Sequence, residues 1–209
     1  MSSEIIEILN RRDLKKLELQ IIVQCTPVLI RDKSSNLLSV EEKYEKSVVR
    51  ICKSMFLETF ELARFNGKII FLVYDESIIK EYFSQKENVD VLYKIGYKKG
   101  NFEYKLLEFK KRYNAYLKKR DMFPHEMGVF LGYPIEDVVG FIEYNGENSL
   151  MTGYWKVYAD VSFKEKLFKK FDDCQVRILK SYASGKSLIE IVNNDFILTK
   201  SLENNKKVI

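Results

Sequence analysis

The sequence predicts a mixed α/β or α+β protein, a sandwich with a central sheet of about four or five strands flanked by helices. Segments with helical periodicity alternate with short β-rich runs along the chain. The clearest run, residues 68–74, is uninterrupted and apolar, which is typical of a strand buried on both faces. With 46% hydrophobic residues in 209, the chain can build one core. We expect a single domain over residues 1–195 and a frayed tail at 196–209.

In the first half of the chain, proline, glycine and helix-capping residues mark where the predicted helices and strands begin and end. Pro27 ends a β-rich run, because proline cannot continue a strand ladder. Ser39 and Glu42 have the spacing of a capping box, and helical spacing continues from there until Gly67. We therefore expect a helix at 4–17, a strand at 19–25, a polar loop at 31–36, a long helix at 39–66 and a strand at 68–74.

In the second half, capping residues again mark the elements. Asp75 and Asn88 are suited to cap short helices, Pro134 lies where helices accept proline, and Gly185 ends a helix. The expected elements are helices at 75–83, 88–96 and 102–120, a strand at 127–131, a helix at 135–144, a strand at 153–159, helices at 162–171 and 173–184, and a last short helix after 187.

The net charge of +5 is unevenly distributed. Residues 94–120 hold ten Lys and Arg against Glu103 and Glu108, a net charge of +8, so the rest of the chain carries −3. A basic helix at 102–120 is suited to dock an acidic protein or a nucleic acid, which gives one candidate function, a non-catalytic interaction module. The same charges also fit an ordinary solvated helix face.

Cysteine usage and the apolar runs indicate the compartment. The three Cys residues, 25, 52 and 174, have no spacing that predicts disulfides or a zinc site, and a single His adds no ligand set, so we expect no bound metal. The N-terminus lacks the pattern of a signal peptide, and the longest apolar run is only strand length. We expect a cytoplasmic protein without a membrane partner.

The scarcest residue types gather in one stretch. The only His, the only Trp, two of the three Pro and five of the nine Gly fall between positions 124 and 155. Within it, residues 132–134 (Gly-Tyr-Pro) are expected to turn from a strand into a helix, whose first N–H groups attract anions. Glu136 and Asp137 in the first turn can satisfy the same helix dipole. An anion site and simple capping are both open.

Three residues carry the candidate catalytic chemistry. His125 is the expected acid–base group, Glu126 its orienting carboxylate, and Cys25 the nucleophile or redox thiol. Cys25 is expected at the carboxyl end of one strand and His125 before the amino end of another. They meet only if the strands run antiparallel or the chain doubles back. A structural His125 and a buried, unreactive Cys25 are the alternatives.

The ligand-binding candidates come from three segments. The loop after the first strand offers cationic and amide groups, the 132–134 turn offers close backbone approach, and residues 153–158 alternate so that Tyr154 and Lys156 share a strand face. Such a face lines a pocket for a flat or anionic ligand, or is covered by a helix. The ligand-binding candidates are Lys33, Asn36, Gly132, Tyr133, Tyr154 and Lys156.

The segments PHEMGVFLGYPIEDVVGFI at 124–142 and GYWKVY at 153–158 resemble the signature of an uncharacterised bacterial family, a domain of unknown function found mainly in clostridia and other anaerobes. Cys25-x-Pro-x-Leu29 is similar to its first block, in which Ala and Thr replace Thr26 and Val28. The resemblance covers most of residues 20–190 and implies no established activity. An anaerobic setting is consistent with a flavin or a tetrapyrrole as the cofactor. We therefore expect the ligand to be a small anionic or cofactor-like molecule.

Overall fold

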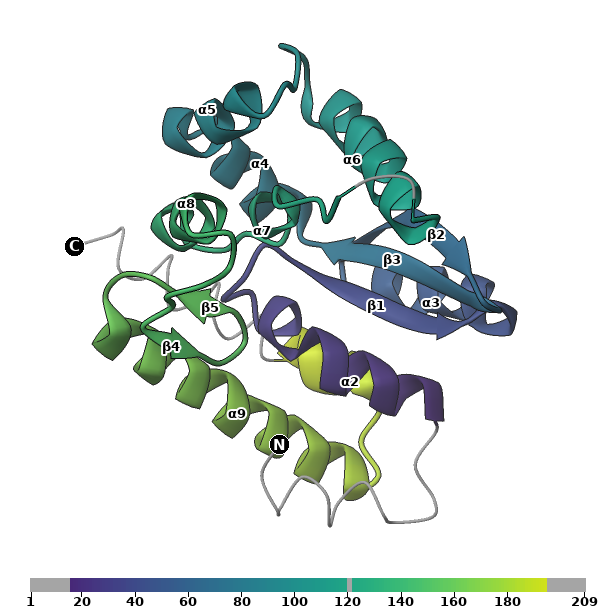
Figure 1. Ribbon diagram of the computed structural model, residues 1–209. Helices are drawn as coiled ribbons and strands as arrows, with labels where there is room; N and C mark the ends of the chain where they lie inside the picture. Colours follow the sequence, from purple (N-terminus) through teal and green to yellow (C-terminus); the bar gives the residue numbers. More distant parts are fainter. Residues whose placement is uncertain (1–15, 120–121, 195–209) are drawn as a thin grey trace, which may run out of the picture.

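The computed structural model describes residues 16–119 and 122–194, and it confirms the mixed α/β class (Figure 1). The five strands lie in two sheets rather than in the single central sheet that the sequence predicts: a three-stranded antiparallel sheet of order β1-β3-β2 and a small hairpin, β4-β5. The elements are α2 (Lys16–Leu29), β1 (Ser35–Glu41), the 3-10 turn η1 (Glu42–Tyr44), α3 (Glu45–Ser54), β2 (Glu58–Phe65), β3 (Lys68–Tyr74), α4 (Glu76–Ser84), α5 (Lys86–Lys94), α6 (Phe102–Leu117), α7 (Met127–Phe130), α8 (Ile135–Glu143), β4 (Met151–Thr152), β5 (Lys156–Val157) and α9 (Val161–Ala183).

The apolar run at 68–74 forms β3, the central strand, as predicted. It pairs antiparallel with β1 on one side and β2 on the other. Ile69, Phe71 and Val73 pack into one core cluster, and Leu72 packs into another. Because side chains alternate across a strand, these clusters lie on opposite faces of the sheet.

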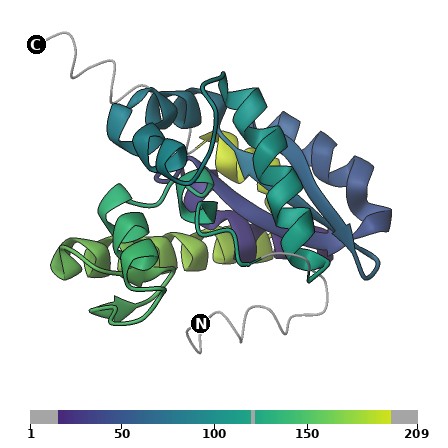
Figure 2. The same cartoon turned by 45° about the horizontal axis from the view of Figure 1, so that its top comes forward.

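Helices cover both faces of this sheet. The first core cluster joins the sheet to α2, α3, the end of α9 and residues 188–192. The second joins it to α4 through α8. Figure 2 shows α6 crossing in front of the sheet and the yellow helical turns of residues 188–194 behind it. A third, smaller cluster packs the β4-β5 hairpin on α9 through Trp155, Val157, Phe168 and Phe171.

The prediction of a strand at 19–25 is wrong, because these residues lie in α2. Ile21, Ile22, Cys25, Val28 and Leu29 have helical spacing and are all buried. Pro27 lies inside the last turn, where it cannot donate to the carbonyl of Val23. That carbonyl instead accepts a hydrogen bond from Gln175 Nε2 of α9 at 3.0 Å, so packing against α9 makes the proline tolerable.

The prediction of one long helix at 39–66 is also wrong. Ser39 belongs to β1, and only residues 45–54 form an α-helix before the chain enters β2. Asn66 and Gly67, with φ of 50° and 72°, make the two-residue turn between β2 and β3. Asn-Gly between two β-rich runs is a strong hairpin signal, so Gly67 marks a turn and not a helix end.

Two further strand predictions are corrected. Residues 127–130 form the helical turn α7, in which Gly128 packs closely on Val138 of α8. Of the strand expected at 153–159, only Lys156 and Val157 are extended, and they pair with Met151 and Thr152. The two helices expected between 162 and 184 are the single helix α9.

Several predicted helices are confirmed. Asp75 caps α4 by accepting hydrogen bonds from the N–H groups of Ser77 and Ile78. The helices expected at 102–120 and 135–144 correspond to α6 and α8. The helix expected at 4–17 falls largely, and the expected tail wholly, outside the described residues. Within residues 16–119 and 122–194, no helix combines the length and apolar character needed to cross a membrane.

Candidate ligand-binding site

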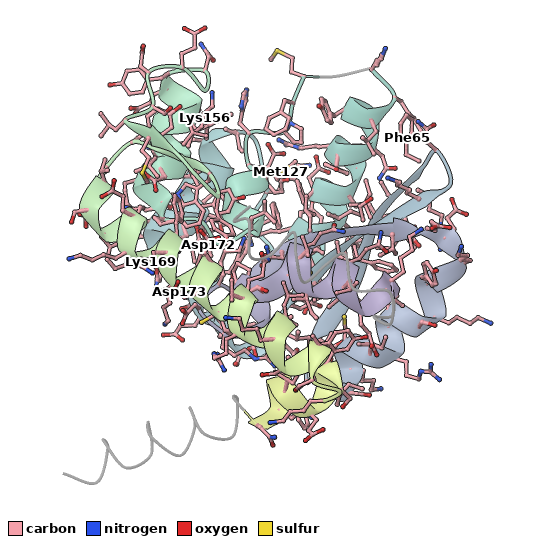
Figure 3. The ribbon with its side chains drawn as sticks, turned by 90° about the horizontal axis from the view of Figure 1, so that it is seen from below. Phe65, Met127, Lys156, Lys169, Asp172 and Asp173 are labelled. Carbon is pink, nitrogen blue, oxygen red and sulfur yellow. The ribbon has the colours of Figure 1, made fainter. Side chains whose placement is uncertain are left out.

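A cavity of about 250 Å³ opens between the segment before α7, α8 and the β4-β5 hairpin. Its walls are mainly apolar, which suits a ligand site that uses few polar groups for orientation. Figure 3 labels two of the lining residues, Met127 near the middle of the view and Lys156 to its left, with Phe65 of β2 on the opposite side of Met127. The lining comprises aromatic Phe123, Tyr133, Phe141 and Trp155, aliphatic Met127, Leu131 and Val138, Gly128, and polar His125, Asp137 and Lys156.

His125 supplies the unsatisfied polar atom of this cavity. Its ring contacts Phe123 and Phe141, with centroid distances of 5.8 and 5.6 Å. Nδ1 is buried and has no hydrogen-bond partner among the described residues. Buried side-chain nitrogens usually have such a partner, so an unpaired one at a cavity wall is available to a ligand.

Glu126 is not placed to orient His125. Its carboxylate is buried and accepts a hydrogen bond from the Tyr97 hydroxyl at 3.1 Å, with Arg112 Nη1 3.6 Å away. Burial, and then this carboxylate, raises the pKa of Tyr97. Arg112 also lies over the Tyr97 ring at 4.3 Å. Glu126 therefore ties α7 to α6 and the segment after α5.

Tyr133 and Trp155 form the inner wall. Their rings stack with centroids 4.7 Å apart and planes 24° apart. The indole N–H of Trp155 donates to Asp137 Oδ2 at 2.8 Å. Asp137 Oδ1 accepts from the backbone N–H groups of Tyr158 and Ala159, at 2.8 and 3.2 Å. Asp137, in the first turn of α8, thus fixes the hairpin that carries Trp155.

Sequence reasoning treated Asp137 only as a candidate helix cap and missed its role in positioning. Buried Lys164 of α9 lies 3.7 Å from Asp137 Oδ2 and forms an ion pair with Glu136 at 2.5 Å. The available signal was the acidic pair in the first turn after Pro134; the contact with Lys164 of α9 is tertiary and has no local signal. Phe123 and Phe141 were also missed, because nothing in their local pattern distinguishes a cavity wall from a core.

Tyr154 and Lys156 do not share a strand face, because residues 153–155 bend between β4 and β5. The Tyr154 hydroxyl donates to Asp172 at 2.9 Å and its ring packs on Phe168 and Phe171 of α9. Lys156 borders the cavity and donates to the Gly146 carbonyl at 2.5 Å. Only Lys156 of this pair therefore faces the cavity beside His125.

The loop after α2 reaches the same wall from the other side. Arg31 pairs with Asp75 at 2.8 Å, and Ser35 Oγ donates to the Phe130 carbonyl at 2.5 Å, which fixes the loop. Lys33 Nζ lies 4.9 Å from the centre of the Tyr133 ring. Gly132, with φ of 65°, lets Ser34 approach so closely that a Cβ there would lie 2.0 Å from Ser34 Oγ.

Asn36 and Cys25 are not brought to the cavity lining. Asn36 lies on β1 opposite Val73, and its Oδ1 is buried without a hydrogen-bond partner among the described residues. Cys25 is fully buried in α2, within the first core cluster. Burial raises the pKa of its thiol well above the usual value, and Cys52 adds to this, while Lys33 opposes it. Cys25 is packed as a core thiol, away from His125.

The basic segment uses several of its charges internally. Lys105 is buried and donates to the Gly100 carbonyl. Lys110 pairs with Glu61 of β2 at 3.3 Å, and Arg112 pairs with Glu108 at 3.0 Å. The Lys110–Glu61 pair attaches α6 to the sheet, and the other two contacts lie within α6 or at its start. All three reduce the positive charge that the exposed face of α6 can offer to a docking partner.

The fold and the cavity define a class: a mixed α/β protein with an aromatic-walled cavity that presents one unpaired imidazole nitrogen. Nowhere in the described part of the chain do three or more His, Cys, Asp or Glu side chains gather as a metal-binding group.

The family model described as "protein of unknown function (DUF3793)" matches residues 21–192, and the chain belongs to this family. No curated protein and no solved structure matches the chain.

Proposed function

We propose that the protein binds a small, flat ligand with an anionic group in the cavity formed by the 124–134 and 153–158 segments. The observation that carries this proposal is the buried, unpartnered Nδ1 of His125 in an aromatic-walled space. A buried polar atom without a partner costs roughly 1–3 kcal/mol. A ligand that hydrogen-bonds to Nδ1 recovers part of that cost.

The size and walls of the cavity specify the ligand further. A volume of about 250 Å³ is at the small end for ligand sites, and it favours a compound of one or two rings over a macrocycle. The stacked Tyr133–Trp155 pair on one side and the ring of Phe141 on another suit a planar apolar body. This favours a simple aromatic acid of one or two rings over the three-ring system of a flavin and over a tetrapyrrole.

Electrostatics favour an anionic group at the rim. Lys156 brings a positive charge to the lining, and within the described residues it donates a hydrogen bond to a neutral carbonyl, that of Gly146. The negative charge of Asp137 is already engaged by two backbone N–H groups, the Trp155 indole and Lys164. A ligand carboxylate or phosphate near Lys156 is therefore attracted more than it is repelled.

A catalytic version of this function rests on His125 alone. His125 carries the only imidazole in the lining, and imidazole is the side chain most often used for general acid–base catalysis. Cys25 is too deeply buried to act on a ligand in this cavity. If the protein is an enzyme, His125 is its acid–base residue and Glu126 supports the fold around it.

Native mass spectrometry of the purified protein, followed by a thermal-shift series with benzoate, nicotinate and flavin mononucleotide, tests the proposal. We expect either a co-purified small molecule or a saturable stabilisation by at least one of these probes. The His125→Phe variant should lose the response, and Lys80→Gln, on the exposed face of α4, should keep it. An apo mass together with no stabilisation by any probe contradicts the proposal.

A further inference from the structure

A second cavity, of about 550 Å³, lies beyond Trp155, between the loop after α2, the turn before α8 and α9. Trp155 is the residue that both linings share. Figure 1 shows α9 passing beneath the β4-β5 hairpin, where it contributes one wall. The groups that matter for its chemistry are Lys33 at the loop, Lys166 and Lys170 on α9, and apolar Trp155, Leu167 and Phe171.

Lys33 is the unusual residue of this cavity. It is 7% exposed, and no described residue lies within hydrogen-bond or ion-pair distance of Nζ. Nζ lies 4.9 Å from the centre of the Tyr133 ring, and it also interacts electrostatically with the Cys25 thiol. A buried ammonium without a carboxylate partner is costly, so such lysines exist partly as neutral amines. Burial lowers the pKa of Lys33 to about 7.

The rim supplies positive charge that can hold an anionic compound. Lys166 and Lys170 are one helical turn apart on α9. Lys170 pairs with Asp32 at 2.5 Å, whereas Lys166 has no ion-pair partner among the residues that the structure covers.

We propose that Lys33 is the reactive amine of a second site, where it forms an imine with a small aldehyde or keto acid that carries a carboxylate. The Nζ lone pair adds to the carbonyl carbon, and the adduct then loses water. The C=N bond replaces C=O, and both amine protons leave with the oxygen. The carboxylate lies toward Lys166 at the rim, and the apolar walls exclude solvent from the imine. This site does not depend on the ligand of the His125 cavity.

Reductive trapping tests the proposal. The full-length protein is incubated at pH 7.5 with glyoxylate and cyanoborohydride, and modified lysines are mapped by peptide mass spectrometry. We expect Lys33 to be labelled at least about tenfold faster than exposed Lys68, because a pKa of about 7 leaves most of the Lys33 amine neutral at this pH. Labelling of Lys33 no faster than Lys68 overturns the proposal.

Matched variants separate reactivity from folding. Lys33→Met keeps a neutral, unbranched side chain at this buried position and has no amine, so label at position 33 disappears while circular dichroism is unchanged. Lys166→Gln should slow labelling of Lys33 by glyoxylate but not by uncharged acetaldehyde. An equal effect on both aldehydes overturns the assignment of Lys166. His125→Phe should leave the labelling of Lys33 intact, so failure of the His125 cavity and failure of this site are distinguishable.

Discussion

The indole N–H of Trp155 donates a 2.8 Å hydrogen bond to Asp137, a fully buried carboxylate in the first turn of α8. This bond joins two segments that the sequence separates by 18 residues. It sets the position of the aromatic ring between the two cavities, because Trp155 lines both of them. Asp137 therefore acts on both candidate sites without lining the second one.

Asp137→Asn should lower the free energy of unfolding by about 3 kcal/mol. The change removes the charge that compensates buried Lys164 and weakens the bonds to the hairpin, and breaking a buried pair by changing one partner is strongly destabilising. Urea unfolding followed by the fluorescence of Trp155, the only tryptophan, measures this. Glu136→Gln, which alters the half-exposed partner of the same lysine, should cost less than about 1 kcal/mol. Equal losses in the two variants contradict the role given to Asp137.

Gly132→Ala should destabilise the protein more than Gly67→Ala. Both glycines have positive φ, so alanine is strained at either position. A Cβ at Gly67 meets nothing within 4 Å, whereas a Cβ at Gly132 overlaps Ser34. The clash should add about 1–3 kcal/mol to the unfolding free-energy change. Adding Ser34→Gly to Gly132→Ala should recover most of that excess, and the absence of recovery would count against the close packing of the two loops.

Stability should rise with pH between about 7 and 8.5 because of Lys33. Its pKa is about 7 in the folded protein and near 10.4 in the unfolded chain, so the unfolded chain binds more protons in this window. The expected gain is about 1.6 kcal/mol, because Lys33 is half protonated at pH 7 and the slope approaches 1.36 kcal/mol per pH unit only above its folded pKa. Chemical denaturation at several pH values measures it. The rise should be missing in Lys33→Met, and an identical slope in both proteins shows that Lys33 stays charged.

His125→Phe should not lower the free energy of unfolding of the ligand-free protein, and it should raise it by up to about 1–3 kcal/mol because it removes a buried unpaired nitrogen. The imidazole makes ring contacts that phenylalanine preserves, and its Nδ1 has no hydrogen bond to lose. Thermal unfolding monitored by circular dichroism provides the comparison. A loss of several kcal/mol indicates instead that His125 is a structural residue.

Local signals predicted some of the fold well. The strand at 68–74 and the helices that begin after Asp75 and Pro134 depend on an apolar run or a cap within the segment itself. Helix α2 could not be predicted in this way, because its β-branched residues favour a strand. Its apolar face is covered by the sheet and α9, and this burial outweighs local preference.

The candidate site, like the fold, could be predicted only where a local signal exists. The crowding of scarce residues indicated the right region, and His125, Tyr133 and Lys156 do line one cavity. The assignment of Lys33 to that same pocket could not anticipate the stacked Tyr133–Trp155 pair. That stack joins positions 22 residues apart in the sequence, and Lys33 lines the cavity beyond Trp155. Tertiary contacts such as the Trp155–Asp137 hydrogen bond determine on which side of the stacked pair each residue lies.

Nitrogen-15 NMR of the protein labelled at histidine tests ligand binding in the His125 cavity most directly, because His125 is the only histidine in the chain. A titration with benzoate, nicotinate or flavin mononucleotide should shift the Nδ1 resonance saturably for at least one probe, as a new hydrogen bond replaces the unpaired state. Lys156→Gln should weaken that titration for an anionic probe. An Nδ1 resonance that stays unchanged at the highest concentration of every probe contradicts the proposal that this cavity is the ligand site.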